Sequence, residues 1–323
     1  MADKPSFEQF FETDLIPALQ PLEEERKALV KKISISCGTV ALVAIAIAVF
    51  LLMNIGNLVL LLFPVIGGIA LGAFLIKWMS AEYIFVFKTQ IVDPIIKYIS
   101  PDLTYLPRSG IPEVRFLASG IFRHRIDRYR CEDHIQGTVG QTHLQFSELH
   151  AEYKTETRDS KGHRRTEWHT IFKGLFFIAD FNKHFKGRTF VLPDSAEKLL
   201  GRFGKKLQEI GKSHGELIKL EDPEFEREFA VYSTDQVEAR YILSPALMRR
   251  MLEFKNKTGE KVYFSFTGGE VNIGISSTKN RFEPKLFSTV LDIELAREFV
   301  EDLQMALDVV EDLNLNTRIW TKE

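Results

Sequence analysis

The longest apolar stretch lies near the start of the chain. From Ile33 to Ile76 there are 44 residues without Asp, Glu, Lys, Arg or His. A bilayer core needs about 20 helical residues, so this stretch is about twice as long as one span requires. Its middle, Asn54-Ile55-Gly56-Asn57, favours a turn. We therefore predict a transmembrane hairpin over residues 33–79, with spans 33–53 and 58–79; the rival interpretation is a buried hairpin in a soluble core.

Basic residues flank this hairpin and are absent from its turn. They are Arg26, Lys27, Lys31 and Lys32 before the first span, and Lys77, Lys88 and Lys97 after the second. The positive-inside rule then places both termini in the cytoplasm.

Small residues recur at helical spacing inside the two spans. Gly68 and Gly72 form a small-xxx-small face in the second span, and Ala44 and Ala48 offer a matching face in the first. Such faces let helix backbones approach closely in a membrane. Two uses remain open: packing of the two spans within one chain, and formation of a homodimer.

The sequence on either side of the hairpin predicts further helices. Residues 1–32 read as an amphipathic helical segment, with a capping box at Ser6 and breaks near Pro17 and Pro21. Residues 80–112 read as an interfacial helix followed by a proline-rich linker. Aromatic residues such as Tyr83 and Phe87 suit the level of the lipid headgroups.

The remaining chain alternates strand and helix patterns, which predicts an α+β fold. We expect a cytosolic subdomain over residues 113–214 and a second, similar one over 215–323 that ends in a long helix. The predicted strands are Ile135–Tyr153, Ile171–Phe181, Arg188–Leu192, Glu228–Tyr232, Lys261–Phe266 and Val271–Ile275. The predicted helices are 194–212, Pro245–Lys255 and Ile293–Leu313.

Composition narrows the possible functions. The chain has 42 Lys and Arg against 44 Asp and Glu, a net charge of −2, so nothing favours bulk nucleic-acid binding. Of the two cysteines, Cys37 lies in the apolar stretch and Cys131 in the charged remainder, which argues against a disulfide between them. Two cysteines so placed also form no zinc motif, and we predict no metal and no cofactor.

One predicted helix carries a basic face. Its members are Lys198, Arg202, Lys205 and Lys206. Such a face attracts anionic lipid headgroups at about 1 kcal/mol per residue near the surface. The alternative is an ordinary solvated surface.

Candidate catalytic chemistry is sparse. Asp180 ends the most apolar predicted strand, and seven of the eight histidines fall between His124 and His184. The histidine spacings match no metal-ligand motif, although His143 and His169 could meet on neighbouring strands. Asp180 is equally suited to a turn at the strand end. No phosphate-binding loop, nucleophile elbow or metalloprotease helix occurs, so we assign no catalytic residue.

Several segments together resemble a known family. They are Ser119–Phe122, Phe146–Leu149, Phe172–Lys183, Thr189–Asp194 and Val231–Leu243. In this order they resemble an uncharacterised bacterial membrane protein family, the domain of unknown function three-one-three-seven, over nearly the whole chain. The resemblance implies a bacterial inner-membrane protein and names no catalytic residue.

These observations favour a membrane-tethered cytosolic domain that binds a protein partner or ligand. The first alternative is a module that binds anionic lipid through the basic face. The second is a membrane-bound enzyme that uses Asp180 and nearby histidines.

Overall fold

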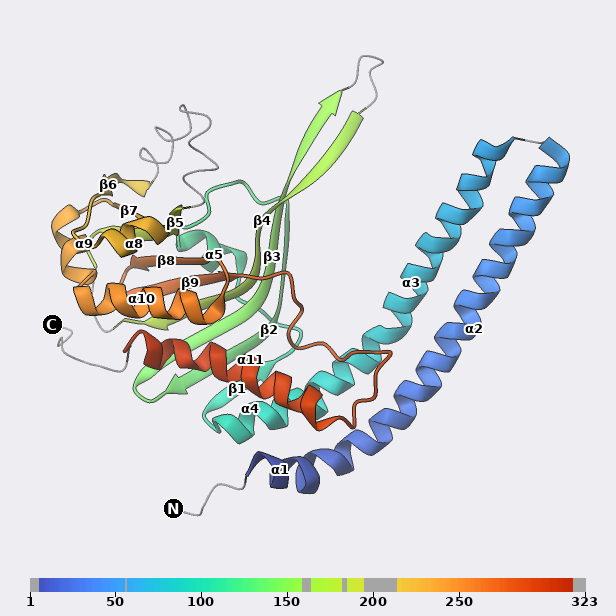
Figure 1. Cartoon of the computed structure of the whole chain (residues 1–323), viewed down its shortest axis with the longest axis horizontal. Coiled ribbons are helices and arrows are strands. Elements are labelled where there is room, and N and C mark those ends of the chain that lie inside the picture. The colour runs from blue at the N-terminus through green and yellow to red at the C-terminus, as the bar shows by residue number, and fades with distance from the viewer. Residues whose placement is uncertain (1–5, 56, 159–163, 182–184, 195–213, 316–323) are drawn as a thin grey trace. The chain divides into compact units, whose positions relative to one another are not determined.

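The computed structural model describes residues 6–55, 57–158, 164–181, 185–194 and 214–315 (Figure 1). The chain forms two compact units. The first contains residues 1–95 and 282–300, and the second contains residues 96–281 and 301–323. The first unit therefore combines the start of the chain with a segment that follows it by almost two hundred residues.

The first unit is a helical hairpin. Its first arm runs from α1 (Phe7–Phe10) through the π-helical turn η1 (Phe11–Leu15) into α2 (Ile16–Ile55). Its second arm contains the 3₁₀ turn η2 (Leu58–Leu61) and α3 (Leu62–Phe87). The hairpin arms lie side by side in Figure 1. At 1.5 Å per residue, the 40 residues of α2 extend about 60 Å, well beyond one bilayer core.

The apolar windows of this hairpin are not covered by protein. Each helix of the hairpin contains a stretch long and apolar enough to cross a membrane. The most apolar stretch of each helix is not buried by other parts of the protein. Large side chains such as Leu42, Phe63 and Ile69 are exposed. A hairpin in a soluble core would bury these groups, so the rival interpretation is wrong and the protein is associated with a membrane.

The helix before the first span is continuous, which corrects the expected breaks near Pro17 and Pro21. Ser6 forms the predicted capping box with Gln9. Pro21 lies inside α2, where it removes only one backbone donor. Helical structure therefore runs from Phe7 to Ile55.

The helix after the second span also differs from expectation. From α3 the chain continues through the π-helical turn η3 (Lys88–Val92) into α4 (Asp93–Ile99). Tyr83 and Phe87 are buried by protein, and the Phe87 ring lies 5.6 Å from that of Phe299. These aromatic rings therefore belong to the core of the first unit rather than to the headgroup region.

The second unit contains a nine-stranded antiparallel sheet with the order β1-β2-β3-β4-β9-β8-β5-β7-β6. The first five strands along the chain are β1 (Leu103–Leu106), β2 (Arg128–Val139), β3 (Thr142–Arg158), β4 (Arg164–Asp180) and β5 (Arg188–Pro193). The others are β6 (Glu216–Ile218), β7 (Phe229–Ser233), β8 (Val262–Thr267) and β9 (Glu270–Ser276).

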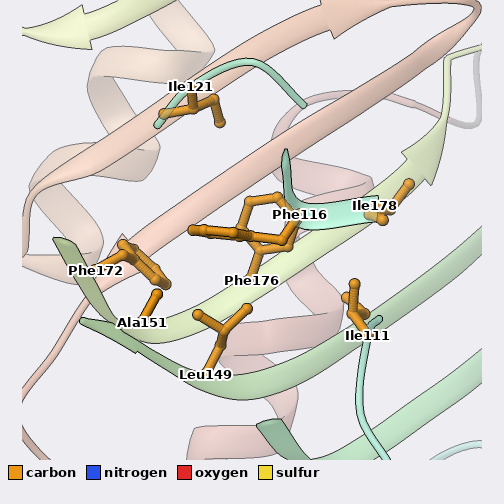
Figure 2. Close-up of a cluster of buried hydrophobic side chains, with 8 residues drawn as sticks. All are labelled: Ile111, Phe116, Ile121, Leu149, Ala151, Phe172, Phe176 and Ile178. Carbon is orange, nitrogen blue, oxygen red and sulfur yellow. The ribbon is translucent and has the colours of Figure 1, made fainter. Parts of the chain in front are cut away.

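Short helices cover both faces of this sheet. They are α5 (Glu113–Ala118), α8 (Pro223–Glu228), α9 (Gln236–Ile242) and α10 (Pro245–Thr258). The last helix, α11 (Ile293–Asp312), has residues in both units. On one face, Phe116 of α5 packs edge-on against Phe176 at 5.0 Å (Figure 2). On the other, Phe254 of α10 meets Phe264 of β8. Burial of these aromatic side chains stabilises the sheet by about 1.5–3 kcal/mol each.

The expected α+β fold is confirmed. Strands from residues 113–214 and from 215–323 nevertheless join one sheet, because β9 pairs with β4 and β5 lies between β8 and β7. The two predicted parts are therefore not separate sheets. The expected proline-rich linker also contributes a strand, β1, which pairs with β2.

Candidate functional site

The β3–β4 ladder extends beyond the rest of the sheet. The pairing of β2 with β3 ends at Glu152, and the pairing of β4 with β9 ends at Gly174. Residues 153–158 of β3 and 164–172 of β4 therefore form a two-stranded ribbon, which we call the arm. It projects from the sheet in Figure 1. A two-stranded ribbon alone is only marginally stable in water, so this feature calls for a functional explanation.

The outer edge of β4 has no further strand partner among the residues that the structure describes. On β3, Asp127 occupies the opposite outer edge by bonding the backbone of Glu152 and Lys154. Backbone groups alternate in direction along an antiparallel strand. Thr166 and Trp168 therefore direct their N–H and C=O groups towards the open side of β4.

Aromatic side chains stiffen the base of the arm. The Arg128 guanidinium lies 3.8 Å from the Trp168 ring centroid, and Arg128 also pairs with Glu152 at 3.1 Å. Trp168 remains 40% exposed. On the other face, Tyr153 stacks on His169 at 4.9 Å. These contacts hold an exposed tryptophan in one orientation without burying it.

The distal end of the arm brings like charges together. Arg158 lies opposite Arg164 in the last described pair, and Arg165 follows on the same strand. Arg165 pairs with Glu167 at 3.1 Å. Like charges directly opposite one another destabilise a ladder, so this end favours an acidic neighbour.

A second polar site, the buried pair of Glu23 and Arg26, lies within the first unit. We call this pair the clasp. Both carboxylate oxygens of Glu23 accept hydrogen bonds from Arg26, from Nε at 2.8 Å and Nη2 at 2.7 Å. Glu23 also accepts from the Val290 N–H at 3.1 Å, and Arg26 donates to the Leu286 carbonyl at 2.9 Å. The pair thereby fastens residues 286–290 to α2.

Burial makes the clasp electrostatically strong. Glu23 and Arg26 are both buried, and the hydrogen bonds from Arg26 lower the pKa of Glu23 to about 2. Nearby, burial raises the pKa of Tyr83 to about 12, and its hydroxyl has no hydrogen-bond partner among the described residues. The clasp is therefore a charged pair at neutral pH whose main contacts are made within the unit.

The structure places the four small span residues on the contacting faces of α2 and α3. Ala44, Ala48, Gly68 and Gly72 are half-buried within otherwise exposed helices. A β-carbon at Gly68 would lie 3.2 Å from that of Ala44, whereas one at Gly67 would meet nothing within 4 Å. The glycine face of α3 is therefore in contact with α2 of the same hairpin.

The candidate catalytic residues are spread along the β3–β4 ladder. His143 lies next to Leu144, which pairs with Ala179 beside Asp180. His169 instead pairs with Tyr153, ten residues further along β3, or about 33 Å at the usual strand rise. The structure thus separates His143 from His169. In the described part of the chain, no three His, Cys, Asp or Glu side chains gather in a way that could hold a metal ion.

The basic face of the predicted helix over 194–212 cannot be placed. Lys198, Arg202, Lys205 and Lys206 lie outside the described residues.

Sequence reasoning missed both the arm and the clasp. The charge of the residues between Tyr153 and Trp168 can be read from the sequence, but the open edge of β4 depends on pairings between distant segments. The spacing of Glu23 and Arg26 permits an ion pair, but its burial depends on a segment some 260 residues away.

Comparison with known proteins gives a family match and little else. Residues 170–315 match the family described as Protein of unknown function (DUF3137). This confirms the expected family resemblance for the part from the end of the arm to the end of α11; the two apolar helices lie outside the match. The chain has no match among curated proteins.

Among solved structures, the chain is similar to the mycobacterial trehalose monomycolate transport factor A. The sequences are 10% identical, and the comparison covers 63% of this chain and 88% of that chain with a TM-score of 0.30. Similarity at this level assigns neither a fold nor a function to the present chain.

Proposed function

We propose that this is a bacterial inner-membrane protein with both termini in the cytoplasm, which holds an α+β domain at the membrane to bind a protein partner. The arm is the binding element, and the partner adds a strand to the open edge of β4. The observation that carries this function is the open edge of β4, where the backbone groups of Thr166 and Trp168 have no strand partner among the described residues. Exposed edges of this kind are templates for strand addition.

The chemistry of the arm also indicates the kind of partner. Trp168 offers a large, oriented apolar surface next to the open edge, which suits the anchor role that tryptophan has in interfaces. Arg158, Arg164 and Arg165 lie at the distal end. The arm therefore suits an extended segment with an apolar residue to contact Trp168 and acidic residues beyond it.

Four exposed lysines support the proposed orientation. Lys27, Lys31 and Lys32 precede the first span and Lys77 follows the second. Arg26 contributes less to this balance than its position suggests, because Glu23 neutralises it within the protein. The positive-inside rule still places these ends of the hairpin in the cytoplasm.

Cysteine labelling tests the orientation. Asn57 lies in the turn between the spans and Asn256 on α10, and both are exposed. With an impermeant maleimide on intact cells, Asn57→Cys should be labelled, whereas Asn256→Cys should need permeabilisation. The opposite pattern would place the domain outside the cytoplasm and remove the proposed function.

Site-specific crosslinking tests the arm. A photoreactive amino acid in place of Trp168 should capture one protein in membranes, and the same group in place of Asn256 should not. If both positions capture the same set of proteins, the arm has no specific role in binding.

A further inference from the structure

One arginine of the second unit lies over a buried ring, and a second arginine lies beside Gly120, which borders the same ring. Arg123 lies in the loop between α5 and β2, and Arg188 begins β5. The Arg123 guanidinium lies 5.8 Å from the ring centroid of Phe190, which is fully buried. A β-carbon at Gly120 would lie 3.0 Å from the Phe190 ring and 3.9 Å from Nη1 of Arg188. Gly120 therefore lies beside both the Phe190 ring and the Arg188 guanidinium.

Contacts with His214 and Phe190 hold the loop that carries Arg123 in one conformation. Gly120 has a φ of 71°, a backbone conformation that favours glycine. Ile121 is buried, and its carbonyl accepts a hydrogen bond from His214 at 3.3 Å. His214 in turn lies edge-on to Phe190, with ring centroids 4.7 Å apart. The arginine pair therefore sits on a preorganised base rather than on a free loop.

Neither guanidinium has a carboxylate partner in the part of the chain that the structure describes. Within the described residues, no Asp or Glu oxygen lies within 4.0 Å of Arg123 or Arg188, although nearby Arg125 pairs with Asp127 at 3.7 Å. Partial burial and the charge of Arg188 lower the pKa of Arg123. The two like charges repel one another, and an anion between them would relieve this repulsion.

We propose that Arg123 and Arg188 bind one phosphate group. Guanidinium groups match phosphate oxygens through paired N–H donors, and two of them can hold one group from two sides. The phosphate could belong to a soluble molecule or to the headgroup of an anionic phospholipid, because both present the same oxygens. This site uses no residue of the arm, so it stands or falls independently of the proposed partner binding.

Binding to the full chain in phosphate-free maltoside detergent tests the proposal. Two probes distinguish the sources: inorganic phosphate, and dihexanoyl phosphatidylglycerol below its micelle concentration. Calorimetric titration should show one bound equivalent of at least one probe. Phosphate binding alone would indicate a soluble ligand, and binding of the phospholipid alone would indicate a headgroup.

Three variants tie the binding to the site. Arg123→Gln and Arg188→Gln should each weaken binding about tenfold or more, as loss of a hydrogen bond to a charged group predicts. Arg188→Lys should recover part of the loss, because the charge remains while the fork is lost. Arg125→Gln, in the same loop but ion-paired, is the matched control and should leave binding unchanged.

The proposal has clear failure conditions. Absence of binding for both probes at about 10 mM, a very weak affinity, would overturn it. So would binding that is equally strong in wild type, Arg123→Gln and Arg188→Gln. Near-ultraviolet circular dichroism of each variant establishes that the fold is intact, so a loss of binding reports on the site.

Discussion

Arg26 of the first unit and the pair Arg123 and Arg188 of the second unit have opposite surroundings. In the first unit, Arg26 is buried, bidentate to Glu23 and bonded to a backbone carbonyl. In the second unit, Arg123 and Arg188 have no carboxylate within ion-pair distance among the described residues. A charged group that is ion-paired within its own unit stabilises the fold. Two like-charged groups that lie near one another without an ion-pair partner instead favour binding of an oppositely charged ligand. The same contrast separates the packed hairpin from the arm, whose β4 edge is open.

Replacing Arg26 or Arg123 by glutamine should give the largest difference in stability between the two units. Arg26→Gln leaves the Glu23 carboxylate buried without its cation, which should cost about 3–5 kcal/mol. Arg123→Gln should change stability by less than about 0.5 kcal/mol, as an exposed position does. Trypsin cleavage after Lys285 should accelerate strongly in the first variant and remain at the wild-type rate in the second. Equal rates would mean that the clasp does not fasten residues 286–290.

Acid should open the clasp only at low pH. The pKa of Glu23 is lowered from 4.5 to about 2, so its contribution to stability is complete above about pH 4.5 and lost as pH falls towards 2. Backbone hydrogen exchange of residues 282–292, corrected for its intrinsic pH dependence, should be constant from pH 7 to 5 and rise below pH 4. Glu23→Gln should remove this dependence, whereas Glu24→Gln at an exposed neighbour should retain it. A rise between pH 7 and 5 would assign the transition to another group.

Two adjacent glycines sharpen the contrast inside the hairpin. Gly68→Val places side-chain atoms against Ala44 and should separate the helices, at a cost of about 1–3 kcal/mol. Gly67→Val points into open space and should have little effect. Gly72→Cys supplies the probe, because its β-carbon would lie 3.9 Å from the Cys37 sulfur. Crosslinking to Cys37 within one chain should be slowed by Gly68→Val and not by Gly67→Val. Crosslinking mainly between chains would instead support the homodimer.

Patterns that depend on local spacing were predictable. The 44-residue uncharged stretch predicted the hairpin, and alternation predicted strands such as Ile171–Phe181 and Val271–Ile275, which the structure contains. The single sheet was not predictable, because β4 pairs with β9 across nearly a hundred residues of sequence. Local pattern sets element type, whereas strand order follows from the burial of both sheet faces.

The functional features follow the same division. Asp180 and the clustered histidines were candidates because of their positions in the sequence, yet His143 and His169 lie far apart on the β3–β4 ladder. The arm, the clasp and the arginine pair arise from contacts between distant segments, as between Arg26 and Leu286. Such sites leave almost no trace in local spacing.

Native mass spectrometry of the full chain, extracted in mild detergent from its own membrane, tests the central claim most directly. Thr166→Pro removes a backbone donor from the open edge of β4, and Thr166→Val retains it. Wild type and Thr166→Val should carry a stoichiometric second protein that Thr166→Pro loses. A chain that is alone in every sample, or a partner that remains bound to Thr166→Pro, would contradict binding by strand addition to the arm.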